Sequence, residues 1–467
     1  MAPRIPVPSG PILFEKDPET GKEIQLIDWN ELSQHNTSSS CWIAVRGKVY
    51  DVTSFLHRHP GGIDTLLYGA GRDSTLVVET YHDLGSLAPI LSKFLIGRLV
   101  SDELPTFPEP NTFHRTLKER VSNHLRSESK DSKNPGLWVI LRYASIYLSV
   151  LGSWSLIFLH PWVKQYWVIQ SILALVLGFG CALIGLHPLH DASHFAITHN
   201  PLVWKLLGAT HDFFNGTSYL IWVYQHMLGH HPYTNIPGAD PDISTNDPDV
   251  RRIQPFQTWY DRYIGQEKYV PFLYGLLAWK TRFQDIYILY VLGMNDSIRI
   301  NPPTLHHHLA FWGGKLFFVG YRIVLPIYLV GLWRTLLVLI LSDLVSSYWL
   351  ALTFQVNHVV DTVEFIASPQ EAACKELSID WAEMQLLTTQ DYAHHSTLWT
   401  WITGGLNYQA VHHVFPQVHQ AHYPDIAPVV ESTCTEYGHK FICQDTFLEA
   451  FNGHITHLRA LGLKSQD

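Results

Sequence analysis

Two apolar stretches decide the fold of this chain: LWVILRYASIYLSVLGSWSLIFL at residues 137–159 and YWVIQSILALVLGFGCALIGL at residues 166–186. A helix needs about 20 predominantly apolar residues to cross the hydrocarbon core of a bilayer, and each stretch has that length. Only a short connection separates them. We therefore predict a transmembrane helical hairpin.

A second apolar pair lies further along the chain, at residues 309–333 and 335–356. Arg322, Pro326 and Asp343 interrupt it, so two buried helices of a soluble protein are the alternative. Spanning is favoured, because a soluble fold would have to cover these long apolar runs completely. Four crossings place both termini and the long segment between the pairs on one side of the membrane.

The composition agrees with a membrane protein. Charged residues make up 16% of the chain, against about 25% in soluble proteins. The net charge of −9 is mild and there is no long basic block, so nucleic acid is not an expected partner. Five widely spaced cysteines without a CxxC motif favour a reducing, cytosol-facing environment over a disulfide framework. The first residues contain no apolar core of a secretory signal.

Histidine is unusually common, with 28 residues against 32 Lys plus Arg. In HDASH, His190 and His194 are four residues apart and project from one helix face, as two ligands of one metal must. HMLGHH repeats this spacing with His226 and His230. The next residue, His231, precedes a proline, which disfavours helical geometry there and lets its ring turn toward the same centre.

A third cluster, QAVHH, places Gln409, His412 and His413 on one helix face. His358 follows directly on the last apolar stretch. With four crossings, all three clusters and His358 share one side of the membrane. Eight histidines are too many for one ion of usual coordination, so we predict a two-metal centre. Imidazole alone does not choose among zinc, copper, iron and nickel.

Residues up to about 103 have the character of a soluble unit that carries two further histidines. FLHRHPGGIDTLLYGAGRDSTLVVETYH contains His59 before a Pro-Gly-Gly turn and His82 further on. Two histidines on opposite walls of an apolar cleft can bind haem iron axially, which permits only electron transfer. By itself, HPGG is equally an ordinary turn signal. A fused one-electron carrier favours iron over zinc in the two-metal centre.

The whole stretch from DWNELSQHNTSSSCWIAVRGKVYDV through HPGG to FLIGRLV resembles cytochrome b5 domains. HDxxH, HxxxHH and QxxHH on four spans resemble the front-end membrane fatty-acyl desaturases. Within them, PLHDASHFAITHNP, LLGATHDFFNG, YQHMLGHHPYTNI and LNYQAVHHVFPQV are most similar to fungal-type Δ5 enzymes. The expected units are a tail at 1–27, a haem domain at 28–103, a linker at 104–136 and a desaturase domain at 137–467.

This resemblance implies an N-terminal α+β haem domain, followed by an all-α four-span membrane domain whose helical cytosolic cap carries the histidine clusters. It implies haem b held by His59 and His82. It also implies two non-haem irons, whose ligands in this sequence are His190, His194, His226, His230, His231, His412 and His413, with His358 from the end of the fourth span.

Two polar residues in the clusters keep alternative roles. Gln409 stands where many related desaturases have histidine, and its amide is either a weak neutral ligand or a hydrogen-bonding support for a ligand. Asp191, inside the first cluster, is either the partner that orients a ligating imidazole or an ordinary polar helix residue.

The activity implied is that of a front-end (Δ5) desaturase, which uses O2 and electrons from its own haem domain to insert a cis double bond into a C20 polyunsaturated acyl chain linked to CoA or phospholipid. No GxGxxG motif follows a strand, so NADH-cytochrome b5 reductase is the expected electron donor. The expected location, among membrane lipids, is the endoplasmic reticulum with both termini cytosolic. The alternatives are a Δ6 desaturase, a sphingolipid Δ8 desaturase or a b5-fused lipid hydroxylase, and more remotely a non-catalytic membrane haem or zinc protein.

Overall fold

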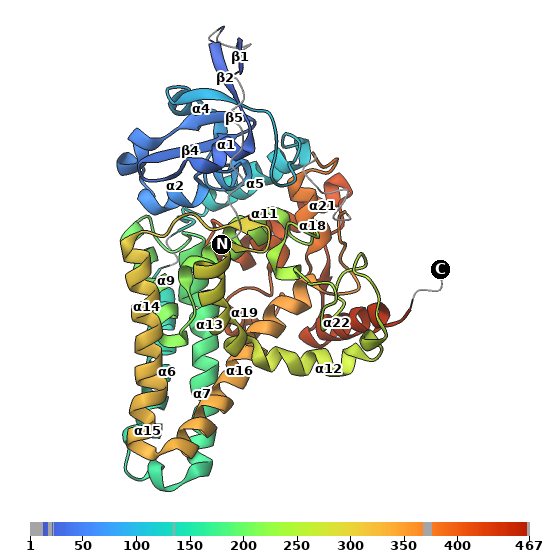
Figure 1. Cartoon of the computed structure of the whole chain (residues 1–467). Coiled ribbons are helices and arrows are strands. Elements are labelled where there is room, and N and C mark those ends of the chain that lie inside the picture. The colour runs from blue at the N-terminus through green and yellow to red at the C-terminus, as the bar shows by residue number, and fades with distance from the viewer. Residues whose placement is uncertain (1–12, 17–20, 22, 134–135, 368–375, 465–467) are drawn as a thin grey trace.

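The computed structural model describes residues 13–16, 21, 23–133, 136–367 and 376–464. An α+β domain lies at one end of the molecule, long helices lie at the other end, and a layer of shorter helices separates them (Figure 1). This arrangement confirms the predicted fold class. Part of the predicted tail at 1–27 and part of the 104–136 linker lie outside the described residues.

The N-terminal domain is built on a six-stranded sheet in the order β1-β2-β6-β5-β4-β3. Alternation along strand β4 sends Cys41, Ile43 and Val45 into one apolar core and Ala44 into another. The strands are β1 (Leu13–Lys16), β2 (Glu23–Ile27), β3 (Asn36–Thr37), β4 (Ser40–Val45), β5 (Lys48–Asp51) and β6 (Leu95–Leu99). The helices are α1 (Trp29–Gln34), α2 (Ile63–Gly69), α3 (Thr75–Tyr81) and α4 (Leu84–Leu91).

Four helical segments are long and apolar enough to cross a membrane: Leu137–Leu159, Trp167–Ser193, Leu305–Val330 and Leu332–His358. Helix α6 (Leu137–Leu159) and helix α7 (Trp167–Ile184) form the first hairpin. Helices α14 (Leu305–Val319) and α15 (Leu325–Val330) precede α16 (Leu332–His358) in the second. The spans lie side by side at the end of the molecule farthest from the α+β domain (Figure 1).

The two charged residues that interrupt the second pair, Arg322 and Asp343, lie close to each other. Asp343 accepts hydrogen bonds at 2.6 and 3.0 Å from Arg282, which is outside the pair, and Arg322 lies 3.5 Å from the same carboxylate. A charge in the hydrocarbon region is costly unless it is paired, and Asp343 has two cationic partners. The interruptions seen in the sequence are therefore compatible with spanning helices.

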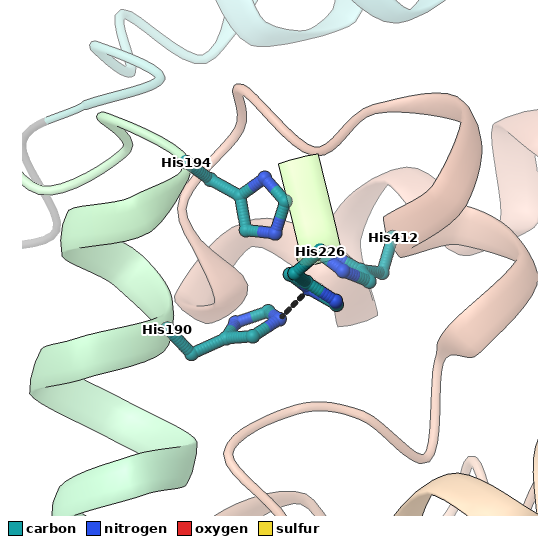
Figure 2. A group of neighbouring side chains, drawn as sticks. All are labelled: His190, His194, His226 and His412. Atoms are coloured by element: carbon teal, nitrogen blue, oxygen red, sulfur yellow. Dashed lines mark hydrogen bonds between the residues drawn. The ribbon is translucent and has the colours of Figure 1, made fainter. Parts of the chain in front are cut away.

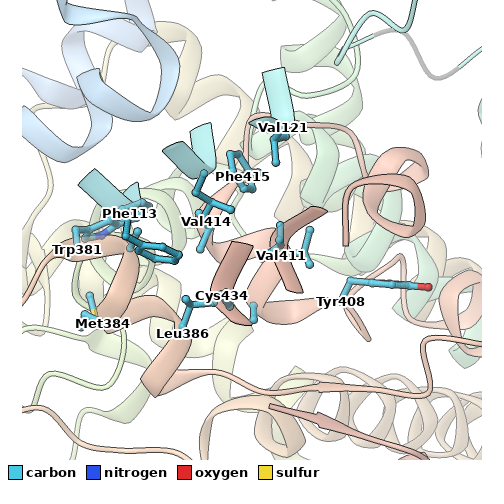
Figure 3. Close-up of a cluster of buried hydrophobic side chains, with 14 of the residues drawn as sticks. Phe113, Val121, Trp381, Met384, Leu386, Tyr408, Val411, Val414, Phe415 and Cys434 are labelled. Carbon is cyan, nitrogen blue, oxygen red and sulfur yellow. The ribbon is translucent and has the colours of Figure 1, made fainter. Parts of the chain in front are cut away.

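The helical layer holds a large apolar core between helices α5, α18 (Trp381–Thr388), α20 and α21 (Tyr423–Tyr437). Helix α5 (Thr112–Ser127) contributes Phe113, Leu117, Val121 and Leu125, whose four-residue spacing forms one face of that helix. Figure 3 shows Phe113 and Val121 in the same cluster as Val411 and Val414 of helix α20 (Gln409–Val414). The core therefore fixes the helix that carries the third histidine cluster.

The other elements complete this layer. Strands β9 and β10 pair in parallel, and β7 and β8 form a small hairpin. The remaining bounds are α8 (His190–Ser193), α9 (Pro201–Asn215), α10 (Tyr219–Trp222), α11 (His231–Tyr233), α12 (Gln266–Leu273), α13 (Leu277–Tyr287), β7 (Met294–Asn295), β8 (Ile298–Arg299), β9 (Asp391–Tyr392), α19 (Thr397–Ile402), β10 (Cys443–Gln444) and α22 (Phe447–Gly462).

Candidate metal centre

The first histidine cluster continues directly from the second span. After α7 the helix widens into a π-helical turn at Gly185–Leu189, and α8 begins at His190. His194 caps the end of α8, and the His190 and His194 rings lie 4.7 Å apart between centroids. Such π-helical turns are rare and often occur at functional sites. The two rings therefore share one face, as their spacing predicts.

The second cluster corrects one detail of the sequence analysis. His231 has helical backbone angles (φ −60°, ψ −46°) despite the proline after it. The π-helix Val223–His230 continues without a break into the short helix α11, so the chain stays helical through His231 despite Pro232. Residues five apart align in a π-helix, so His226 and His231 face each other with their Nε2 atoms 3.2 Å apart.

Four histidines from all three clusters converge into one group: His190, His194, His226 and His412. One ring nitrogen from each lies within 4.8 Å of the others. Figure 2 shows the four side chains gathered around one point. All four side chains are buried. This arrangement fits the donor set of a single metal ion.

A second group consists of His230, His358 and His413, whose ring nitrogens also lie within 4.8 Å of one another. His231 belongs to a third such set with His412 and His413, so it lies between the two groups. All eight histidines predicted from the sequence are therefore adjacent in one buried cage. Their number and division into two groups suit two ions.

Gln409 lies at the second group. Its Nε2 is 2.9 Å from His358 Nε2, and Asn357 Nδ2 donates to its Oε1 at 3.3 Å. The side chain is fully buried. The amide thus stands beside the ring nitrogen of a candidate ligand.

The donor set fits a metal because several ring nitrogens have no other partner. His412 Nε2, His413 Nε2 and both ring nitrogens of His194 are buried and lack hydrogen bonds among the described residues. Buried polar atoms are nearly always satisfied, so such a concentration indicates an absent group. Burial, followed by the neighbouring imidazoles, holds the pKa of His194, His226, His231, His412 and His413 well below the usual value, which leaves neutral rings with free lone pairs.

The opposite ring nitrogens of several candidate ligands are held by polar residues. Tyr423 Oη lies 2.8 Å from His412 Nδ1, and Gln385 Oε1 lies 2.9 Å from His413 Nδ1. Both Asp240 oxygens lie 3.1 Å from His230 Nδ1. Such partners orient metal-binding imidazoles. They lie outside the three motifs, so motif spacing did not reveal them.

Negative charge is concentrated at His230. Burial lowers the pKa of this imidazole, but the carboxylates of Asp240 and Asp242 outweigh burial and raise it to about 9. The same charges favour a cation in the second group. The Asp191 carboxylate has a different role. It accepts hydrogen bonds from Tyr143 and Gln420 and lies 3.2 Å from His419 Nε2, and none of these three residues is a candidate ligand.

The predicted haem ligands face each other in the N-terminal domain. The His59 and His82 ring centroids are 6.1 Å apart. Two imidazoles that share one metal ion would have about this separation, because each contributes a metal–nitrogen bond of about 2.0 Å and the distance from its nitrogen to its ring centre. Thr65 Oγ1 lies 3.0 Å from His59 Nδ1. A Cβ at Gly61 would come within 2.9 Å of the His59 ring, which explains the first glycine of HPGG. Burial lowers the pKa of both histidines, so both rings are neutral donors.

Polar contacts join this domain to the helical layer. Lys205 Nζ lies 2.6 Å from Asp64 Oδ2, and Asn301 Nδ2 donates to the Leu67 carbonyl at 2.6 Å. His306 and His307 also approach Asp64 and resemble a third metal group. The Lys205 ammonium already neutralises the shared carboxylate oxygen, so this group is a contact between the domains.

Comparison with known proteins agrees with this architecture. Residues 167–444 match the family model described as fatty acid desaturase, and residues 28–100 match that of the cytochrome b5-like heme/steroid binding domain. An acyl-lipid (8-3)-desaturase of Mortierella alpina is 55% identical, covering 94% of this chain and 98% of that protein. In Dictyostelium discoideum, an acyl-lipid (8-3)-desaturase B is 39% identical (96% and 97% covered) and a Delta(5) fatty acid desaturase A is 38% identical (95% and 94% covered).

The chain thus joins a haem-binding domain to a membrane-associated domain with a histidine cage. Its cofactors are haem and a pair of non-haem irons, and its reaction uses a fatty acyl substrate, O2 and transferred electrons. We conclude that the chain is an oxidoreductase and belongs to the cytochrome b5-fusion front-end fatty acid desaturases.

Proposed function

We propose that this protein is a Δ5 desaturase, which inserts a cis double bond near the carboxyl end of a C20 polyunsaturated acyl chain. The observation that carries the proposal is similarity over nearly the whole chain to Delta(5) fatty acid desaturase A, at 38% identity. The three histidine clusters, including QAVHH, resemble those of the front-end group. The carboxyl end of the substrate is expected to anchor at a set distance from the metal centre.

Two sets of residues hold the irons in this proposal. His190, His194, His226 and His412 would hold one ion, and His230, His358 and His413 would hold the other, with His231 between the two groups. Gln409 would support His358 through its amide. In the N-terminal domain, His59 and His82 would hold the haem iron.

The bound irons supply activation of O2 and removal of hydrogen from an unactivated methylene, and the haem supplies single electrons. The chain supplies the conditions for this chemistry. Burial keeps the imidazoles of His194, His226, His231, His412 and His413 neutral. Tyr423 and Gln385 fix the rotation of the His412 and His413 rings, and Asp240 fixes that of His230. Because every cage histidine is buried, bulk water is kept from the reacting atoms.

The electron donor and the location follow from the same proposal. An NADH-cytochrome b5 reductase reduces the haem domain from outside, since no nucleotide-binding motif appears in the sequence. The enzyme resides in the endoplasmic reticulum membrane with both termini and the histidine cage on the cytosolic side. The haem domain extends to about residue 103, the linker to about 136, and the desaturase domain follows.

Product analysis tests this function. Yeast that expresses the protein and receives a Δ8-unsaturated C20 acid should accumulate a product with a new Δ5 double bond. The control is the same strain with the His412→Ala variant, which should form none. A Δ6 product, a Δ8 sphingoid base or a hydroxylated lipid would assign the protein to one of the other reactions.

A further inference from the structure

We propose that Tyr81 and Phe195 form the contact through which electrons pass from the haem domain to the metal centre. The inference rests on the desaturase reaction and is independent of which carbon is attacked. Tyr81 directly precedes His82, and Phe195 directly follows His194. The two aromatic rings lie 5.5 Å apart between centroids. A proposed haem ligand and a proposed iron ligand are therefore joined through chain neighbours and one through-space contact.

Helix α3, which ends at Tyr81, lies directly against the iron cage. Leu76, Val77 and Tyr81 line a cavity of only about 10 Å³ together with the cage residues His194 and His231. A space this small leaves room for about one water molecule. The helix that leads into His82 thus lies against the cage on its haem-domain side.

The backbone at Phe195 indicates that its ring is needed there. Phe195 has φ +52°, a left-handed conformation that glycine usually adopts at the end of a helix. Its N–H donates to the Ala192 carbonyl at 3.1 Å, and the Ala196 N–H donates to the Asp191 carbonyl at 2.9 Å. Glycine would make both bonds without strain. Termination of α8 therefore does not explain a phenylalanine at this position.

The neighbours of the Phe195 ring supply the explanation. The ring lies between Tyr81 of the haem domain and Trp204 of α9, whose centroid is 4.9 Å away. The Tyr81 hydroxyl is buried and has no hydrogen-bond partner among the described residues. The aromatic contact, and not a hydrogen bond, thus holds Tyr81 beside the cage. Strained residues that persist at such places are often tied to function.

The electron count is simple. In each transfer one electron would pass from the haem held by His59 and His82, reduced beforehand by the external reductase, to the ions held by the histidine cage. No bond forms or breaks in Tyr81 or Phe195. One double bond takes two such transfers, because two acyl hydrogens, two protons and two electrons convert O2 into two water molecules. Since tunnelling weakens exponentially with the width of a gap, side chains that fill the gap control the rate.

The test uses the full-length enzyme loaded with haem and iron. Tyr81→Leu removes one ring, and Phe195→Gly removes the other while keeping the left-handed helix end. Tyr81→Phe retains the ring. Tyr68→Leu is the matched control, because Tyr68 contacts Tyr224 across the same two domains at 5.7 Å, on a different helix. Haem spectrum, iron content and the rate of haem reduction by NADH and reductase are measured first for each variant.

The decisive measurement is reoxidation of the reduced haem after mixing with O2 and acyl substrate. Tyr81→Leu and Phe195→Gly should slow it at least about tenfold, equivalent to ~1.4 kcal/mol of activation free energy, while haem reduction stays unchanged. Tyr81→Phe and Tyr68→Leu should stay near the wild-type rate. Wild-type reoxidation in Tyr81→Leu, or equal slowing in Tyr68→Leu, would overturn the proposal.

A second measurement needs no turnover. In iron-free protein, the loss of thermal stability in the Tyr81→Leu and Phe195→Gly double variant should be smaller than the sum of the single losses, because the two rings touch. Additive losses would contradict the contact. An incorrect Δ5 assignment can be distinguished from failure of this proposal. In that case the wild-type enzyme forms a different lipid product, while the haem reoxidation rates and the stabilities of the variants stay as predicted here.

Discussion

Single residues of the iron cage combine burial with unused hydrogen-bonding capacity. His194 has no partner among the described residues at either ring nitrogen, and His412 is held only at Nδ1 by Tyr423. A buried imidazole in this condition is costly unless a metal takes its lone pair. We therefore expect these side chains to be more sensitive to substitution than other buried histidines, such as His454, which is bonded at both nitrogens.

Replacement of His412 tests the cage most directly. His412→Ala should lower iron content and abolish desaturation, because His412 contributes to both the four-histidine group and the set with His231 and His413. The haem spectrum should persist, since the haem ligands lie in another domain. Tyr423→Phe is the graded comparison and should reduce iron affinity or activity by about 10–100-fold. Metal analysis that finds full iron in His412→Ala would contradict the ligand assignment.

The role of Gln409 depends on its contact with His358. Gln409→His should retain desaturation and iron, because an imidazole can replace the amide next to His358 Nε2. Gln409→Leu, similar in size but apolar, should reduce both desaturation and iron content, because His358 Nε2 would then face an apolar side chain. Iron content and product yield, measured together, distinguish the two variants. Equal loss in both would show that the amide is specifically required.

At the scale of secondary-structure elements, π-helical turns bring the first two clusters into register. One lies at Gly185–Leu189 just before His190, and the other, Val223–His230, contains His226. In an ordinary α-helix, residues five apart point to different faces, so His226 and His231 would diverge. The π-helical turn aligns them, which is why all three histidines of HMLGHH reach the cage.

The close approach of α7 and α16 matters because these spans lead to His190 and His358. A Cβ at Gly178 would lie 2.3 Å from the Ser342 carbonyl oxygen, whereas nothing lies within 4 Å of a Cβ at Gly152. Alanine favours a helix by about 1 kcal/mol over glycine at either position. At Gly178 the clash outweighs this gain, with an expected net cost of up to about 2 kcal/mol.

Gly178→Ala should therefore lower the midpoint of thermal unfolding and the iron content, while Gly152→Ala should leave both unchanged or slightly raise the midpoint. Unfolding of the detergent-solubilised protein and metal analysis check this pair. A stabilised Gly178→Ala variant would show that the two spans are not in contact at this point.

On the scale of the whole molecule, the haem domain is docked on the helical layer and does not hang from a free linker. Lys205–Asp64, Asn301–Leu67 and the aromatic pair Tyr68–Tyr224 join the two parts. A docked domain has a fixed orientation toward the cage, which a tether alone does not provide.

Loss of the haem tests the need for this fused domain. His59→Ala should remove the haem spectrum and most turnover while iron content stays normal, because the iron cage lies in the other domain. Added free cytochrome b5 should restore little activity, since helix α3 of the docked, haem-free domain still lies against the cage and blocks access to that side. Full rescue would show that the electron entry site is open to an outside donor.

Local patterns in the sequence were sufficient for the fold class, the four spans, the haem-binding domain and the grouping of histidines into clusters. Those features depend on apolar run length and on helical spacing, which act over a few residues. Only the tertiary structure decided how the histidines divide into two groups, that His231 is helical, that Gln409 neighbours His358, and that Tyr81 touches Phe195. These relations join residues far apart in the chain, and they are set by how whole helices pack, which spacing within one helix does not encode.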